Sequence, residues 1–114
     1  LEDLRKAREY GAYFETFIYH HLRILARLMT PAGRLYFWRT MDGNEVDFVL
    51  EYGRRLLAVE VKLTDNLGYR DTEGLRLFFK DHPKASGGLV IYSGKQVKRM
   101  DEKIVAIPWS LVTG

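Results

Sequence analysis

Residues 45–62, EVDFVLEYGRRLLAVEVK, carry the pattern from which the fold of this 114-residue chain is predicted. Two alternating runs, residues 45–51 and 55–63, flank the turn sequence Tyr52-Gly53-Arg54. Residues two apart on a strand share a face, and the short turn predicts antiparallel neighbours. The first run should place Val46, Phe48 and Leu50 opposite Glu45, Asp47 and Val49. The second should place Leu57, Val59, Val61 and Leu63 opposite Ala58, Glu60, Lys62 and Thr64.

Helix and strand patterns surround this pair. Apolar residues recur at helical spacing from residue 3 to residue 29, and Thr30-Pro31-Ala32-Gly33 ends that helix. Gly11 interrupts the helical pattern, which suggests that another element packs closely there. We expect strands at residues 35–40, 86–92 and 104–107, helices at 71–81 and 108–112, and a polar loop at 93–102. The apolar strand 86–92 suits a parallel neighbour, and the order α-β-β-β-α-β predicts an α/β domain.

Composition and charge exclude several classes of protein. The chain has 18 basic and 15 acidic residues, a formal net charge of +3, and 46% hydrophobic residues, which is ordinary globular composition. It lacks cysteine, which excludes disulfides and thiolate sites and fits a cytoplasmic location. It has neither an apolar run long enough for a membrane span nor a signal-peptide pattern. Because the chain begins with Leu1 rather than Met, we expect one domain, residues 1–114, cut from a longer chain.

The chemistry is predicted to lie where the two alternating runs meet. Asp47 on one strand and Glu60 on the next should converge on one face, and two such carboxylates repel unless a cation lies between them. A hard ion such as Mg²⁺ or Mn²⁺ prefers oxygen ligands and keeps waters for a substrate. Lys62 shares the face of Glu60 and would position a water or stabilise charge on a phosphate. Glu15, at the edge of the apolar arc of the first helix, can reach the same rim.

The order of these residues resembles the PD-(D/E)XK nuclease-like superfamily. Its pattern of a helix glutamate, a strand Asp and E-x-K is matched by Gly-Ala-Tyr-Phe-Glu15, Glu-Val-Asp47 and Glu60-Val-Lys62, although Val46 replaces the usual Pro. More narrowly, the chain is similar to the uncharacterised C-terminal domain of prokaryotic AAA-type ATPases. The matching phrases include Tyr-Phe-Trp-Arg-Thr, Gly-Asn-Glu-Val-Asp-Phe-Val and Ile-Pro-Trp-Ser-Leu, and the resemblance spans about residues 9–111.

The resemblance implies a restriction-endonuclease-like three-layer core with a mixed central sheet. It implies that Asp47 and Glu60 bind Mg²⁺ or Mn²⁺, that Lys62 acts at the phosphate, and that Glu15 assists the metal or orients the site. The activity it implies is phosphodiester hydrolysis on DNA, beside an ATPase domain located upstream. The alternatives are a non-catalytic module that binds DNA or protein and regulates that ATPase, or an oligomerisation domain.

Other polar and aromatic residues invite functional interpretations that ordinary packing explains as well. Glu45 is a second possible metal ligand, and Thr64 a possible phosphate contact. The adjacent His20 and His21 point about 100° apart on a helix and cannot chelate one ion together. Trp38 and Arg39 could contact nucleic acid, but core packing for Tyr36 and Trp38 and a salt bridge for Arg39 are expected. Lys95, Lys98 and Arg99 are expected to be solvated. Gly87-Gly88 lacks the pattern of a phosphate-binding loop.

Overall fold

The computed structural model describes residues 2–29 and 32–113, with side chains from Arg5 onward; Leu1, Thr30 and Pro31 lie outside the described residues. Within this part of the chain, three α-helices and six strands follow the order α1 (Glu2–Leu28), β1 (Arg34–Arg39), β2 (Glu45–Tyr52), β3 (Arg55–Lys62), α2 (Glu73–Asp81), β4 (Gly87–Tyr92), β5 (Lys98–Asp101), β6 (Ile104–Pro108) and α3 (Ser110–Thr113). A 3-10 turn, η1 (Tyr69–Thr72), precedes α2. The predicted α/β class and element order are confirmed.

The strands form one mixed sheet in the order β1-β2-β3-β4-β6-β5. β1, β2 and β3 are antiparallel neighbours, as the turn sequences predict. Gly43 and Gly53 have positive φ values of 92° and 60°, which glycine adopts without steric cost. β4 lies between β3 and β6 and is parallel to both, which confirms the interpretation of its apolar run.

One strand was missing from the prediction. β5 falls within residues 93–102, which we expected to form a loop, and it pairs with β6 at the edge of the sheet. Its sequence is Lys-Arg-Met-Asp, so it lacks the apolar alternation by which strands are recognised. Charged side chains are common on edge strands because they discourage pairing with other chains. Pairing with the next strand, β6, therefore decides the structure of this segment.

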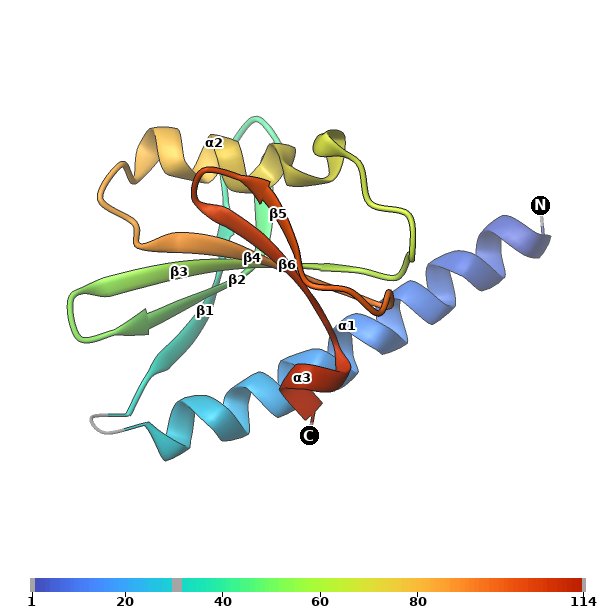
Figure 1. Cartoon of the computed structure of the whole chain (residues 1–114), viewed down its shortest axis with the longest axis horizontal. Coiled ribbons are helices and arrows are strands. Elements are labelled where there is room, and N and C mark those ends of the chain that lie inside the picture. The colour runs from blue at the N-terminus through green and yellow to red at the C-terminus, as the bar shows by residue number, and fades with distance from the viewer. Residues whose placement is uncertain (1, 30–31, 114) are drawn as a thin grey trace.

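The sheet is covered by helices on both faces, with α2 on one side and α1 with α3 on the other (Figure 1). On the α2 face, Leu75 and Phe78 pack against Ala58, Val90 and Tyr92. On the α1 face, Ile18 packs against Phe48, Val59 and Ile91. Alternate residues of β3 thus enter opposite cores, as predicted, and the three layers are confirmed.

The long helix α1 extends past the sheet. Its N-terminal part projects beyond the strands (Figure 1), and residues 5–10 are exposed. Gly11 lies in this region, and a Cβ added there would have no atom within 4 Å. The prediction that another element packs closely against Gly11 is therefore wrong. At the other end, the amide of Gly33 donates to the carbonyl of Ala26 at 2.8 Å, beyond the last helical residue.

Candidate functional site

Asp47 and Glu60, called here the acid pair, meet at the end of the β2–β3 ladder. The ladder pairs Phe48 with Val59 and continues to the turn. Beyond it, each acid accepts a main-chain hydrogen bond from the opposite strand. The Asp47 amide donates to Glu60 Oε1 at 3.3 Å, and the Val61 amide donates to Asp47 Oδ2 at 2.8 Å. The predicted convergence of these two carboxyl groups is thus seen in the structure.

A β-bulge in the pairing of β1 with β2 lies beside Asp47. Tyr36 pairs with Val49 but Trp38 pairs with Val46, so two residues of β2 face the single residue between them on β1. As a result Val46 and Val49 both enter the α2-side core, whereas Phe48 enters the α1-side core. The prediction that Val46 shares a face with Phe48 is therefore wrong, whereas Phe48 and Val49 lie on opposite faces as predicted. The extra residue interrupts the period of two, and Asp47 is one of the two residues at the bulge.

Glu60 is buried rather than solvated. Its exposed fraction is 8%, because α2 covers this face of the sheet. A Cβ on Gly74, the second residue of α2, would lie 3.0 Å from Glu60 Oε2 and 2.7 Å from the Glu45 carbonyl oxygen. Glycine at position 74 thus permits the helix to approach the acid. Sequence reasoning did not single out Gly74, although a glycine near a helix start was the available signal.

Burial governs the ionisation of Glu60. Desolvation, then the Asp47 charge and a side-chain hydrogen bond with Asp47, raise the pKa of Glu60 to about 9, although the Lys62 charge opposes the shift. Glu60 therefore carries a proton at neutral pH, and this proton reduces the repulsion between the two carboxyl groups. An acid pair with one bound proton is a group that a divalent cation can occupy once that proton leaves.

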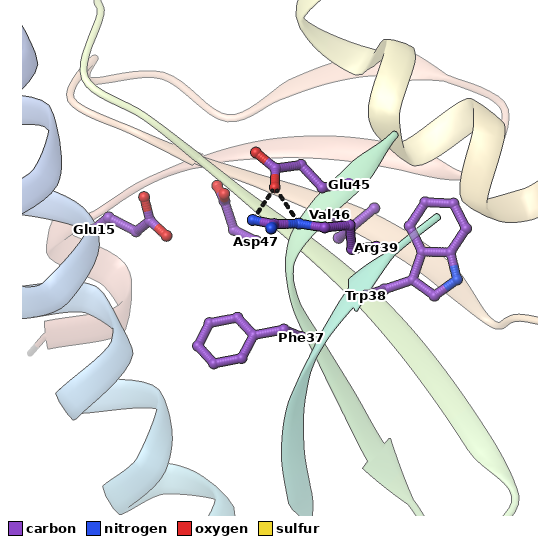
Figure 2. A pocket seen from close by; sticks show the side chains of 7 residues that line it. All are labelled: Glu15, Phe37, Trp38, Arg39, Glu45, Val46 and Asp47. Carbon is purple, nitrogen blue, oxygen red and sulfur yellow. Dashed lines mark hydrogen bonds and ion pairs between the residues drawn. The ribbon is translucent and has the colours of Figure 1, made fainter. Parts of the chain in front are cut away.

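Asp47 of the acid pair lines a cavity of about 540 Å³, called here the acidic cavity. Its lining comprises Glu15, Phe37, Trp38, Arg39, Glu45, Val46 and Asp47. Glu15 points from α1 toward Asp47 across this space (Figure 2). Burial, followed by the Asp47 and Glu45 charges, raises the pKa of Glu15. Three acids from two layers thus face one cavity, which favours a cation as its occupant.

Arg39 is the cation among the residues that line this cavity. Its Nε and Nη2 donate to Glu45 Oε2 at 3.2 and 2.9 Å, as the dashed lines in Figure 2 mark. The two residues are register partners on β1 and β2, so the sheet itself holds them together. The predicted salt bridge of Arg39 is confirmed. Glu45 engages Arg39, and its other expected role, as a metal ligand, stays a prediction.

The four predicted site residues are brought together to different degrees. Asp47 and Glu60 are in contact, Lys62 acts electrostatically on Glu60, and Glu15 lies across the cavity. Within residues 2–29 and 32–113, no three acidic or histidine side chains form a group able to hold a metal ion in this side-chain arrangement. Binding a metal through all three acids would require Glu15 to move toward the acid pair. Their roles as metal ligands stay predictions.

The remaining polar residues mostly serve the structure. The Thr64 hydroxyl oxygen accepts a hydrogen bond from the Asn66 amide at 3.1 Å and so orders the loop after β3. His21 packs on the Phe17 ring at 4.5 Å between centroids, whereas His20 is exposed. Trp38 packs against Phe78 as expected.

Two further expectations concern Tyr36 and the glycine pair of β4. The expected core packing of Tyr36 is wrong, because 40% of this residue is exposed. Gly87 and Gly88 form the start of β4. A Cβ on Gly88 would lie 3.1 Å from the Phe79 ring, so this glycine lets α2 pack closely on the sheet.

Comparison with known proteins identifies the family but not an activity. No curated protein matches the sequence. In the part of the chain that the structure describes, no helix is long and apolar enough to span a bilayer. One family model, described as a domain of unknown function (DUF4143), matches residues 10–112, which confirms the resemblance to an uncharacterised domain. Because the match covers most of the 114 residues, the chain belongs to the DUF4143 family.

Proposed function

We propose that this domain is a metal-dependent phosphodiesterase of the nuclease type that acts on DNA. The observation that supports it best is the acid pair, in which Asp47 and Glu60 each accept a main-chain amide from the other's strand beside Lys62. Two carboxyl groups of neighbouring strands are held in contact, and a third acid, Glu15, faces Asp47 across the acidic cavity (Figure 2). The set combines oxygen ligands for a cation with an ammonium for a phosphate.

The acid pair suits Mg²⁺ or Mn²⁺ because it offers only hard oxygen donors. Asp47 and Glu60 would hold the ion, and Glu15 would contribute from α1. A bound ion would polarise a phosphoryl oxygen and lower the pKa of a water molecule. Its presence would also favour loss of the proton that Glu60 carries at neutral pH, since that proton and the ion compete for the same oxygens.

Two cationic side chains of the domain would act on the DNA phosphate. The Lys62 ammonium, two residues after Glu60, would donate to a phosphate oxygen or position the attacking water. The Arg39 guanidinium lines the acidic cavity, and two of its nitrogens contact Glu45. A guanidinium has five N–H donors, so Arg39 can bind a phosphate oxygen while Glu45 orients it.

Cleavage of a supercoiled plasmid in Mn²⁺ tests this proposal. The parent chain should nick the plasmid, and Lys62→Ala should abolish nicking while the circular dichroism spectrum stays unchanged. Lys80→Ala, which removes an exposed lysine on α2, is the matched control and should nick at the parent rate. Equal nicking by Lys62→Ala and the parent would point to a contaminating nuclease and refute the proposal.

The second candidate is a module that binds DNA or protein without cleavage and regulates an attached P-loop ATPase. The position of Glu15 favours it, because among the described residues the three acids do not form a ready metal site. This candidate predicts no nicking with any divalent metal. Binding to DNA would instead weaken steeply as salt rises, whereas salt-independent binding would indicate a protein partner.

A further inference from the structure

A second cavity, called here the aromatic groove, lies where α1 meets the segments that follow β3, β4 and β6. It measures about 360 Å³ and is lined by Tyr13, Phe14, Phe17, Leu63, Ser93 and Trp109. Trp109 makes edge-to-face contacts with Phe14 and Phe17, at 6.3 and 6.0 Å between ring centroids. Tyr13 is 73% exposed and Phe17 44% exposed, so aromatic surface faces solvent here. Exposed aromatic surface gathered in one hollow indicates a binding site.

Cationic residues adjoin this groove. Lys62 directly precedes Leu63 in the chain but shares the face of Glu60, so it lies toward the acid pair rather than in the groove. Ser93 also lines a neighbouring cavity of about 270 Å³, together with Asp65, Lys95 and Lys98. An aromatic hollow beside lysines suits a ligand that has both flat rings and negative charge, and nucleic acid has both. A purely apolar partner would make no favourable electrostatic contact with these lysines.

The aromatic groove and the acidic cavity lie at the same end of the strands. Arg39 ends β1, Glu45 begins β2 and Lys62 ends β3, so these three residues lie at one end of the strands. Leu63, Ser93 and Trp109 follow β3, β4 and β6 at that same end. A nucleic acid lying across this end of the sheet would contact the acid pair, then Lys62, then the aromatic groove. A single-stranded segment fits best, because stacking on a protein ring requires a base whose face is not already covered.

We propose that the aromatic groove binds an unpaired base of single-stranded DNA by stacking, with Lys95 and Lys98 contacting the adjacent phosphates. This inference deepens the proposed function and rests on it for the choice of DNA as ligand. Stacking itself needs no metal, so binding can be measured in EDTA, where the hydrolytic site is inactive.

Fluorescence of Trp109 in the intact chain provides the test. The protein has two tryptophans, and Trp38→Phe leaves Trp109 as the single reporter. Titration with a twelve-residue oligo(dT) in EDTA should quench this fluorescence, whereas an abasic strand of equal length and charge should not. Tyr13→Ala should weaken oligo(dT) binding about tenfold, as expected for loss of one stacking ring. Tyr10→Ala, which removes another exposed tyrosine of α1, should leave the affinity unchanged.

Several results would overturn the inference. Equal affinity for the oligo(dT) and abasic strands would show that only charge is recognised. Tighter binding to a duplex than to the single strand would exclude stacking of unpaired bases. Self-association that Tyr13→Ala abolishes would assign the groove to a second copy of the chain. Stacking without any nicking activity would support this inference and refute the hydrolytic proposal. Nicking activity in a chain whose Trp109 fluorescence is not quenched by oligo(dT) would support the hydrolytic proposal and refute this inference.

Discussion

The ionisation of Glu60 predicts that the folded domain loses stability as pH rises from 5 to 8. Glu60 has an ordinary pKa of 4.5 in the unfolded chain and a pKa raised to about 9 in the folded one. Between these values the native state holds one proton more than the unfolded state, so the free energy of unfolding falls as pH increases. The slope is about 1.4 kcal/mol per pH unit for one proton, or about 4 kcal/mol over three units as an upper limit.

Glu60→Gln isolates this contribution. The amide keeps an oxygen to accept the Asp47 amide and supplies a donor to the Asp47 carboxyl group, but it does not ionise. The free energy of unfolding of Glu60→Gln, relative to that of the parent, should therefore increase from pH 5 to pH 8. Both proteins contain the same three histidines, so taking the difference cancels their titration.

Urea denaturation at pH 5, 6, 7 and 8, followed by circular dichroism, measures both profiles. Glu9→Gln, which changes an exposed glutamate of α1, is the matched control and should keep the parent slope. Parallel profiles of Glu60→Gln and the parent would refute the reasoning, because they would mean that Glu60 ionises alike in both states.

Four other predictions follow from the surroundings of individual residues. Mn²⁺ affinity should rise as pH increases toward 9, because the ion competes with the proton on Glu60; calorimetry in buffers of different ionisation enthalpy should find about one proton released at pH 7. Gly74→Ala should destabilise the domain by about 1–3 kcal/mol in urea denaturation, because its Cβ would lie 2.7 Å from the Glu45 carbonyl oxygen. Gly11→Ala, with no atom within 4 Å, should instead stabilise it by about 0.5–1 kcal/mol. Arg39→Ala should change stability by less than about 1 kcal/mol, since its bridge to Glu45 is exposed, yet weaken DNA binding and reduce its salt dependence in anisotropy titrations.

Local sequence patterns determined most of the fold. The period of two in residues 55–63 and the glycine turns at Gly43 and Gly53 specified antiparallel strands. The apolar run of β4 specified a strand with parallel neighbours on both sides. These features depend on which residues share a face and on which conformations glycine allows, and both are properties of the chain itself.

The details of the site were decided by tertiary structure. A β-bulge opposite Phe37 interrupts the alternation of β2. This bulge is a property of how β1 pairs with β2 and not of the residue composition of either strand. The burial of Glu60 depends on how closely α2 approaches through Gly74, which lies 14 residues later in the chain. The polar strand β5 exists because β6 pairs with it. The approach of α2 that buries Glu60 and raises its pKa is a contact between separate elements of the fold, so the local residue pattern around Glu60 does not specify it.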